Sequence, residues 1–596
     1  MTENLPDRKI LESHRELQKK RIEILALPPQ QALDRILSDP QPAALVHSFP
    51  DNDFYLLVHD IGPEEALPLL ALASGQQWDH MVDLESWGRD RIENNSVTRW
   101  LNLLLEADPK RFIQWFLKER LSFVEFYLFH NIEVRVREHD QDPSEFGEGF
   151  FTLDQVYYMR FLNLPAALQG SAIGEEERRN FLMKFLERLA AHDHLVFQNV
   201  LLEATHVIPA ETEEEELRWR NVRLAEKGFL AFDEAIGIYQ AVQPRDLEKQ
   251  TPKYMPSTRE APSPFPVPAY PLRELREDNP FSRALARIEP ADALTHVQWE
   301  FTNLCNQIIV ADHKTIRDRE QLRDIVRKAC GYISIGLERM QGEGKTEVDP
   351  GKAAACLIRY PLIQLFRLGF GAALELKWQA ERWLSRCWFA KARLRLTFWG
   401  EQWMGVLGGI LLKKPLFYDN YKTGVLYREF TSAEDVACAA GVLKQVQAVD
   451  HLLSIMNVPL NPPAQYAFLT WKNLLLTRWA RYRLGLKEEK LSPLALKPFT
   501  SFFTELLPGK PSPDSAEPRR IPDSMKTAFM GWLTHETGLT DYEISEKLGR
   551  VFEDLFAEIE AEYGRVAAKD LDPRFVQLFI LKAAEQRSIP PPSDAR

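Results

Sequence analysis

Cysteine is scarce and scattered in this sequence. Its five cysteines are far apart from one another, and all lie between residues 305 and 438. There is no CxxC pair, which excludes a zinc finger or a dithiol redox site built on that motif. The odd number and wide spacing also exclude a small disulfide-stapled fold. Because they lie in apolar stretches, we expect buried thiols at Cys305, Cys330, Cys356, Cys387 and Cys438.

Common motifs of enzymes and membrane proteins are also missing. GxSxG, HExxH and GxGxxG do not occur, so we predict no catalytic residue, metal or cofactor, and we lean against an enzyme. The N-terminal stretch 1–25 lacks the apolar core of a signal peptide, and we expect a cytoplasmic protein. The most membrane-like run, 396–412, is short for a span and contains Glu401 and Gln402. It predicts a buried core helix, and we expect no transmembrane span.

Positive charge is in deficit, with 74 Lys and Arg against 86 Asp and Glu, a net charge of −12. This argues against nucleic-acid binding over the whole surface, but it does not exclude a local basic patch. The chain has 596 residues, 45% of them hydrophobic, which is enough for about four folding units with apolar cores.

Short helical patterns dominate the N-terminal region. Between residues 28 and 118, short helical units follow Pro or Asp, and each is too short to bury its own apolar face. Stacked neighbours would bury these faces together, as they do in α-solenoids. We therefore predict a mainly α, multi-unit protein with an α-solenoid-like N-terminal region and small β-hairpin insertions.

Two hairpins and two Pro-rich segments interrupt the helical pattern. Residues 132–138 alternate with a period of two, and residues 416–430 contain the turn Lys422-Thr423-Gly424. Nine prolines in 244–280 predict an extended linker. The predicted regions are a helical superhelix-like region 1–130, a hairpin insertion 131–165, a helical region 166–243, the linker 244–280, a central helical domain 281–507, a second linker 508–522, and a helical unit 523–596 with a disordered tail.

Two weak motifs favour structural roles. GEGKT at 342–346 resembles a phosphate-binding loop, but its first glycine is replaced by Arg339 and the preceding residues predict a helix. His192 and His194 point about 200° apart on a predicted helix, so they cannot share a metal ion. Glu203 and His206 form one half of a di-iron pattern without a second half. We predict no metal here and expect His192 to be a core or interface residue.

The strongest local anomaly is the segment 377–403. It contains six basic residues against two acidic ones, and five of the protein's 14 tryptophans. If it forms one helix, Arg382, Arg386 and Arg393 lie between two apolar faces and are partly buried, so they need anionic partners. We prefer the protein's own carboxylates as these partners. The alternative is an anion-binding cavity with tryptophan as a stacking surface, formed by Arg382, Arg386, Arg393, Trp378 and Trp403.

Two resemblances to known families add to this interpretation. The run PPQQALDRILSDPQPAALVHSFPDNDFYLLVHDIGPEEALPLLAL is similar to the N-terminal helical superhelix of MgtE-type magnesium transporters. That resemblance implies a fold only, and magnesium sensing is not assigned to Asp51, Asp53 or Asp60. Over its whole length the chain resembles a bacterial family of unknown function, through DNDFYLLVHDIGPEEALPLLALAS, FFTLDQVYYMRF and YREFTSAEDV. The second resemblance implies no known activity.

The leading functional hypothesis is a cytoplasmic helical scaffold that presents grooves to a protein partner. The alternative is a module that binds an anionic ligand or nucleic acid through residues 377–403. An enzyme of an unidentified class comes third. The sequence indicates neither an oligomeric state nor a pathway.

Overall fold

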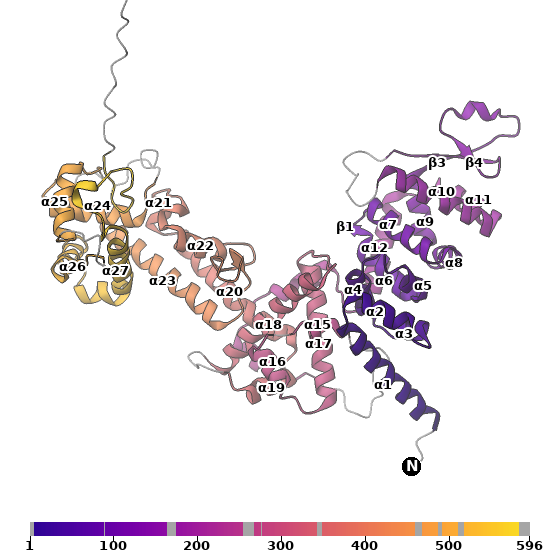
Figure 1. The fold of residues 1–596 in the computed structure, drawn as a ribbon, viewed down its shortest axis with the longest axis horizontal. Coiled ribbons are helices and arrows are strands. Elements are labelled where there is room, and N and C mark those ends of the chain that lie inside the picture. The colour runs from indigo at the N-terminus through magenta and orange to yellow at the C-terminus, as the bar shows by residue number, and fades with distance from the viewer. Residues whose placement is uncertain are drawn as a thin grey trace, which may run out of the picture. The chain divides into compact units, whose positions relative to one another are not determined.

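Helices dominate the protein, as predicted (Figure 1). The computed structural model describes residues 5–88, 90–163, 174–253, 268–275, 277–342, 348–458, 468–486, 492–509 and 518–582. The chain divides into two compact units, Met1–Phe370 and Gly371–Arg596. This division falls within a helix, and both Pro-rich segments lie inside a unit.

The N-terminal helices of the first unit pack on near neighbours in the chain, such as α2 on α4, α4 on α6 and α5 on α7. Three of them have a proline as their first residue, where the missing N–H costs no hydrogen bond. The α-solenoid-like stacking of these short helices stays a prediction. Their bounds are α1 (Leu5–Ala26), α2 (Pro29–Leu37), α3 (Pro42–His47), α4 (Asp51–Ile61), α5 (Leu67–Leu72), α6 (Gly75–Glu85), α7 (Asn94–Ala107), α8 (Pro109–Glu119) and α9 (Leu121–Asn131).

The small β-elements of the first unit follow these helices. Strands β3 (Ile132–Val136), β4 (Phe151–Thr152) and β5 (Tyr157–Phe161) form an antiparallel sheet in the order β3-β5-β4. The predicted hairpin in this region is therefore present, with a third short strand added. A second pair, β1 (Trp87–Gly88) and β2 (Arg91–Ile92), joins α6 to α7.

The rest of the first unit is helical and contains one close helix crossing. A Cβ on Gly336 would lie 2.2 Å from the Leu365 carbonyl oxygen, and one on Gly369 would lie 1.9 Å from that of Tyr332. Only glycine allows α18 and α20 to approach this closely. The helices are α10 (Glu175–His192), α11 (His194–Ala204), α12 (Pro209–Glu226), α13 (Phe232–Ala235), α14 (Pro244–Glu248), α15 (Tyr270–Arg273), α16 (Pro280–Leu285), α17 (Ala291–Ala311), α18 (Arg319–Gln341), α19 (Pro350–Arg359) and α20 (Leu362–Leu384), the last of which continues into the second unit.

The described ends of the first Pro-rich segment are anchored on the first unit. On one side, Lys253 Nζ binds Glu300 Oε2 at 2.7 Å. On the other, the Asp53 carboxylate accepts hydrogen bonds from the backbone N–H groups of Ala269 and Tyr270, at 2.8 to 3.1 Å. Residues 244–253 and 268–275 therefore belong to the packed body of this unit.

The second unit combines helices with the predicted second hairpin, in which β6 (Phe417–Tyr418) pairs with β7 (Tyr427–Arg428). Gly405 and Gly409 lie under this hairpin, and a Cβ on Gly405 would be 2.4 Å from the Tyr418 ring. The run 396–412 forms a 3-10 turn, η4 (Leu396–Trp399), and then a helix. The helices are α21 (Trp388–Lys391), α22 (Glu401–Ile410), α23 (Ala433–Ile455), α24 (Trp471–Arg483), α25 (Leu496–Leu506), α26 (Asp523–Thr537) and α27 (Asp541–Tyr563).

Aromatic side chains fill the core of the C-terminal helices. The Trp479 ring contacts Phe502 and Phe529, with ring centroids 5.2 and 5.1 Å apart. Arg519, next to the second Pro-rich segment, donates hydrogen bonds to several backbone carbonyls, among them that of Gly564 at 3.0 Å. The described residues 518–522 are thus part of this packed unit.

Two further sequence predictions have mixed outcomes. Of the five cysteines, Cys305, Cys330 and Cys387 are buried and Cys356 is half-buried, but Cys438 is exposed, so the prediction of buried thiols was wrong there. Among the described residues, no single helix combines the length and apolarity that a membrane span requires. Only α19 and α20 taken together do so, and they are bent by 117°.

Candidate functional site

A buried network of charges holds helix α12 in place. Asp83, on α6, accepts hydrogen bonds from Arg223 at 2.7 and 2.9 Å and from Arg120 at 2.9 Å. Arg220 donates to the Asp83 carbonyl oxygen at 2.7 Å, and Glu216 lies 4.0 Å from Arg120. Because Glu216, Arg220 and Arg223 are spaced i, i+4, i+7, they share one face of α12. That face points into the unit.

Burial and pairing oppose each other in this network. Burial alone would raise the pKa of Asp83, but Arg120 and Arg223 lower it. Burial lowers the pKa of Arg220 to about 10, against the attraction of Asp83. Burial also raises the pKa of Glu216. The network fixes the orientation of α12, so its opposite face is held at the surface.

A sharp turn after α12 places the next helix. Gly228 has a φ of 85°, and a Cβ at this position would lie 2.2 Å from Asn303 Oδ1. Lys227 Nζ binds Asp51 Oδ2 at 2.8 Å, and Phe229 is buried. The chain then enters α13. The turn therefore has a required glycine and anchors on both sides.

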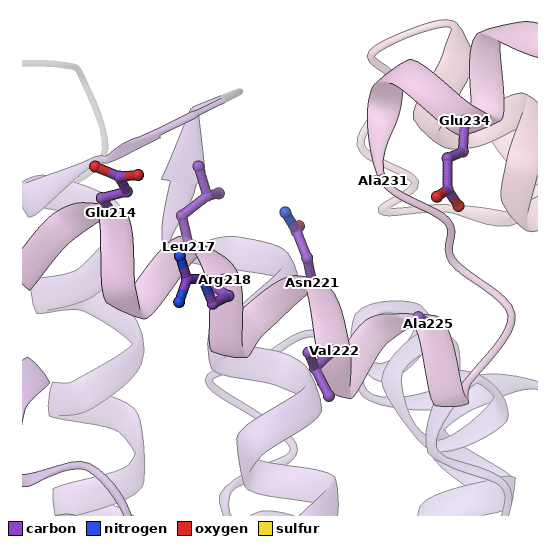
Figure 2. A pocket seen from close by; sticks show the side chains of 8 residues that line it. All are labelled: Glu214, Leu217, Arg218, Asn221, Val222, Ala225, Ala231 and Glu234. Atoms are coloured by element: carbon purple, nitrogen blue, oxygen red, sulfur yellow. The ribbon is translucent and has the colours of Figure 1, made fainter.

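An open pocket of about 420 Å³ lies between the outer face of α12 and α13. Figure 2 shows Leu217 and Asn221 standing up from α12 and Glu234 projecting from α13 toward the same space. Apolar groups form much of its surface. The lining residues are Glu214, Leu217, Arg218, Asn221, Val222, Ala225, Ala231 and Glu234.

Exposed apolar and acidic side chains surround the pocket. Val222, which lines the pocket, is 47% exposed, and Phe232, next to the lining residue Ala231, is also exposed. Of the acidic side chains, Glu214 and Glu234 line the pocket, and both are exposed. An apolar surface with an acidic edge suits the apolar face of a basic helix.

The Arg/Trp segment does not form the single helix on which its prediction depended. Helix α20 ends at Leu384, and a turn leads into α21 and η4. Asp450, on α23, accepts hydrogen bonds from the N–H groups of Trp388 at 3.3 Å and Phe389 at 2.8 Å, and from Trp383 Nε1 at 3.3 Å. These bonds satisfy the start of α21 from a distant part of the sequence.

The arginines of this segment lie at the surface, so the prediction that they are partly buried was wrong. Arg382, Arg386 and Arg393 are exposed, as are Lys391 and Arg395. In the part of the chain that the structure describes, none of these five side chains has a carboxylate oxygen within 4.0 Å. The carboxylates of the described residues are therefore not their partners. Anion binding by this segment stays a prediction.

The two tryptophans predicted to join those arginines have different environments. Trp378 is 43% exposed, and its carbonyl oxygen accepts a hydrogen bond from Arg382 Nε at 3.2 Å. Trp403 is half-buried and stacks on Trp471, with centroids 5.0 Å apart and planes 7° apart. Trp378 is therefore available for a ligand, whereas one face of Trp403 is used internally.

The histidine-rich segment forms two helices, because α10 ends at His192 and the Asp193 side chain caps α11. His192 is exposed, so the prediction of a core residue was wrong, and the alternative of an interface residue stays a prediction. His206 Nδ1 lies 3.0 Å from the Leu202 carbonyl oxygen, and Glu203 is exposed. Among the described residues, no group of three or more potential ligands could hold a metal ion.

Residues 343–347, most of the GEGKT motif, lie outside the described residues. The segment before them is helix α18 and not the strand that a phosphate loop follows, as expected from the sequence.

A second buried cluster was not predicted. Glu85 lies 2.5 Å from Tyr55 OH and 3.2 Å from His59 Nε2, and Arg317 lies 3.4 Å away. Burial alone would raise the pKa of Glu85, but the contacts with His59, Tyr55 and Arg317 lower it to about 2. Both Glu85 oxygens thus have partners inside the protein, which favours a structural role.

The acidic residues of the transporter-like run are also used internally. Asp51 binds Lys227, Asp53 binds backbone N–H groups, and Asp60 binds Arg319 and, at 2.8 Å, Tyr270 OH. The sequence reasoning missed these contacts because their partners lie far along the chain. For α12, the i, i+4, i+7 spacing of Glu216, Arg220 and Arg223 was a visible signal of a shared face.

Comparison with known proteins supports the whole-chain resemblance. The model of a family described as a family of unknown function, DUF6178, matches residues 8–582. No curated protein and no solved structure matches the chain. The likeness to magnesium transporters therefore stays a prediction from the sequence.

Proposed function

This chain belongs to DUF6178, a family of unknown function, and we propose that it is a helical interaction protein of the cytoplasm. In this proposal, the α12–α13 pocket binds an amphipathic helix of a protein partner, and the partner helix carries Lys or Arg beside its apolar face. The observation that carries the proposal is the pocket of about 420 Å³ with exposed apolar side chains and an acidic edge.

The exposed apolar surface supports a protein ligand. Val222 lines the pocket and is about half exposed, and burying such an apolar side chain against a partner favours association. A helix in a groove buries apolar anchors at i, i+3, i+4 and i+7. The pocket offers Leu217, Val222 and Ala225 to such anchors.

The charges support a basic ligand. Among the eight lining residues, Glu214 and Glu234 are acidic and Arg218 is basic. Complementary charge speeds association and selects the partner more than it adds affinity. The buried Asp83 network keeps α12 rigid, which lowers the entropic cost of binding.

The test is selection of helical peptides from a random display library on the full-length protein. We expect enrichment of peptides with apolar residues at helical spacing and a net positive charge. The change Val222→Glu places a carboxylate in the pocket. It should weaken binding of the selected peptides by about tenfold or more, because a partner helix would bury that charge.

The matched control is Tyr542→Glu, because Tyr542 is an exposed aromatic residue on α27, at 74% exposure. It should leave peptide affinity unchanged. Enrichment of acidic peptides, or peptides that bind the Val222→Glu variant as well as the wild type, would refute this use of the pocket.

A further inference from the structure

We propose that residues 382–395 of the second unit bind single-stranded nucleic acid, a function separate from the α12–α13 pocket. This stretch contains five cations and no acidic residue, in a chain with a net charge of −12. Since all five are exposed and none is paired with a carboxylate among the described residues, their charge faces solvent. The five are Arg382, Arg386, Lys391, Arg393 and Arg395.

Several other arginines of the same unit are paired with carboxylates. Arg428 binds Asp419 at 2.9 Å and both oxygens of Asp435 at 2.7 and 2.8 Å. Arg478 binds Glu536 at 3.0 Å. These arginines show that the lack of a carboxylate partner is not general in this unit, and residues 382–395 bring five such cations together.

A rigid aromatic base holds the basic segment in place. The Trp399 ring lies 5.8 Å from Trp383 and 5.3 Å from Phe389, centroid to centroid, and Phe389 and Trp399 are buried. The Asp450 carboxylate accepts three hydrogen bonds from this segment, so the charge of Asp450 is bound on the inner side of the segment. The exposed cations thus project from a fixed backbone.

The backbone at Arg393 has a conformation that is uncommon for arginine, in the hydrogen-bonded turn that ends α21. Its φ is 54°, in the left-handed region that glycine and asparagine adopt most easily. An arginine in this position keeps a cation in the turn between α21 and η4. Strained residues cluster at binding sites, because the site fixes the side chain.

The nature of the ligand follows from the combination of charge with an exposed ring. Arginine binds phosphate oxygens in a bidentate manner, and five cations along a bent segment suit the phosphates of a flexible strand. Trp378 lies one helical turn before Arg382 and is 43% exposed, so its ring can stack on a base. A simple anion would use the cations without the tryptophan.

The same features suit an anionic membrane surface less well. Membrane-surface helices pair a basic face with a broad apolar face. Here the large apolar residues Phe389, Phe398 and Trp399 are buried in the unit. We therefore choose single-stranded nucleic acid.

The experiment measures fluorescence anisotropy of labelled oligo-dT and oligo-U of 20 nucleotides with the full-length protein, between 50 and 300 mM salt. We expect binding that weakens as salt increases, because cations on the protein displace counterions from the strand. In the triple variant Arg386→Gln, Arg393→Gln, Arg395→Gln, affinity at 50 mM salt should fall at least tenfold. The slope of log affinity against log salt should decrease by about 2, at about 0.7 per phosphate contact.

The matched control removes three exposed cations from elsewhere in the same unit: Lys547→Gln, Arg550→Gln, Lys569→Gln. It should keep wild-type affinity and slope. The change Trp378→Ala should weaken oligonucleotide binding about tenfold and leave polyphosphate binding unchanged, because only a base can stack.

Several results would overturn the proposal. The proposal fails if the protein does not bind the oligonucleotides at 50 mM salt, or if the control variant loses as much affinity as the triple variant. It also fails if polyphosphate competes as well as the oligonucleotide and Trp378→Ala has no effect. Binding to phosphatidylserine vesicles without oligonucleotide binding would assign the segment to a membrane surface instead. None of these results bears on the α12–α13 pocket, which is tested with peptides.

Discussion

Arginine has opposite environments in two regions of this protein, the Asp83 network of the first unit and residues 382–395 of the second. In the first unit, Arg120 and Arg223 bind the buried Asp83. In the second unit, Arg386 and Arg393 are exposed and have no carboxylate within 4.0 Å among the described residues. The comparison teaches that arginine content alone says little about function. Burial and partners decide whether an arginine stabilises the fold or is available to a ligand.

The largest expected effect on stability comes from changing an arginine of the buried Asp83 network. Arg120→Gln leaves the Asp83 carboxylate buried with one arginine fewer, and we expect a loss of about 3–5 kcal/mol in the free energy of unfolding. Chemical denaturation followed by circular dichroism measures this. A loss below about 1 kcal/mol would contradict the view that this network clamps α12.

The pH dependence of stability gives the next test, at the buried carboxyl group of Asp53. Burial raises the pKa of Asp53 to about 6, although the N–H groups of Ala269 and Tyr270 oppose the shift. A raised pKa means that Asp53 binds its proton more tightly in the folded protein than in the unfolded chain. The contribution of this proton to the free energy of unfolding is complete below the pKa of the unfolded chain, and it is lost as pH rises through about 6. The loss is about 3 kcal/mol at most. Unfolding of wild type and Asp53→Asn between pH 4 and 8 measures it.

The sign of this pH dependence distinguishes Asp53 from other buried carboxylates. Glu85 has a pKa of about 2, so its contribution is present above its unfolded pKa and is lost only as pH falls toward 2. It therefore changes little above pH 5. If lowering the pH from 8 to 5 stabilises the wild type no more than it stabilises Asp53→Asn, then Asp53 does not bind the proton.

The smallest expected effect on stability comes from changing an exposed arginine of residues 382–395. Arg386→Gln should change the free energy of unfolding by less than about 0.5 kcal/mol, because an exposed, unpaired side chain leaves no buried charge behind. Thermal and chemical unfolding beside the Arg120→Gln variant measure the contrast. A loss of several kcal/mol would mean that Arg386 has a structural partner, and it would remove the difference between the two regions.

Much of the fold was predictable because it depends on local patterns. The hairpin at 416–430 follows from its turn at Lys422-Thr423-Gly424, and the helix 319–341 follows from its apolar spacing. The break after His192 had a visible signal as well, since Asp193 is a strong N-cap residue. Helical periodicity continued across it, and the capping signal was missed.

The rest depended on contacts between distant residues. No proline or glycine marks the break after Leu384. The break is stabilised by Asp450, which lies far along the chain on α23 and satisfies the start of α21. The hydrogen bonds that join Arg223 to Asp83 and Asp53 to Ala269 span 140 and 216 positions of the sequence. A single sequence gives no means of pairing them, so neither the arginine environments nor the α12–α13 pocket could be derived from it.

The anchors at the two ends of the first Pro-rich segment make the first unit suitable for fragment complementation. Lys253 binds Glu300 and Tyr270 binds Asp60, so contacts across the segment join residues on both sides of it. A chain cut between residues 253 and 268 should therefore stay together under native conditions and separate only in denaturant. Separately expressed halves, 1–253 and 268–596, should then reassemble without a covalent link, and the segment between them should be replaceable by a foreign sequence.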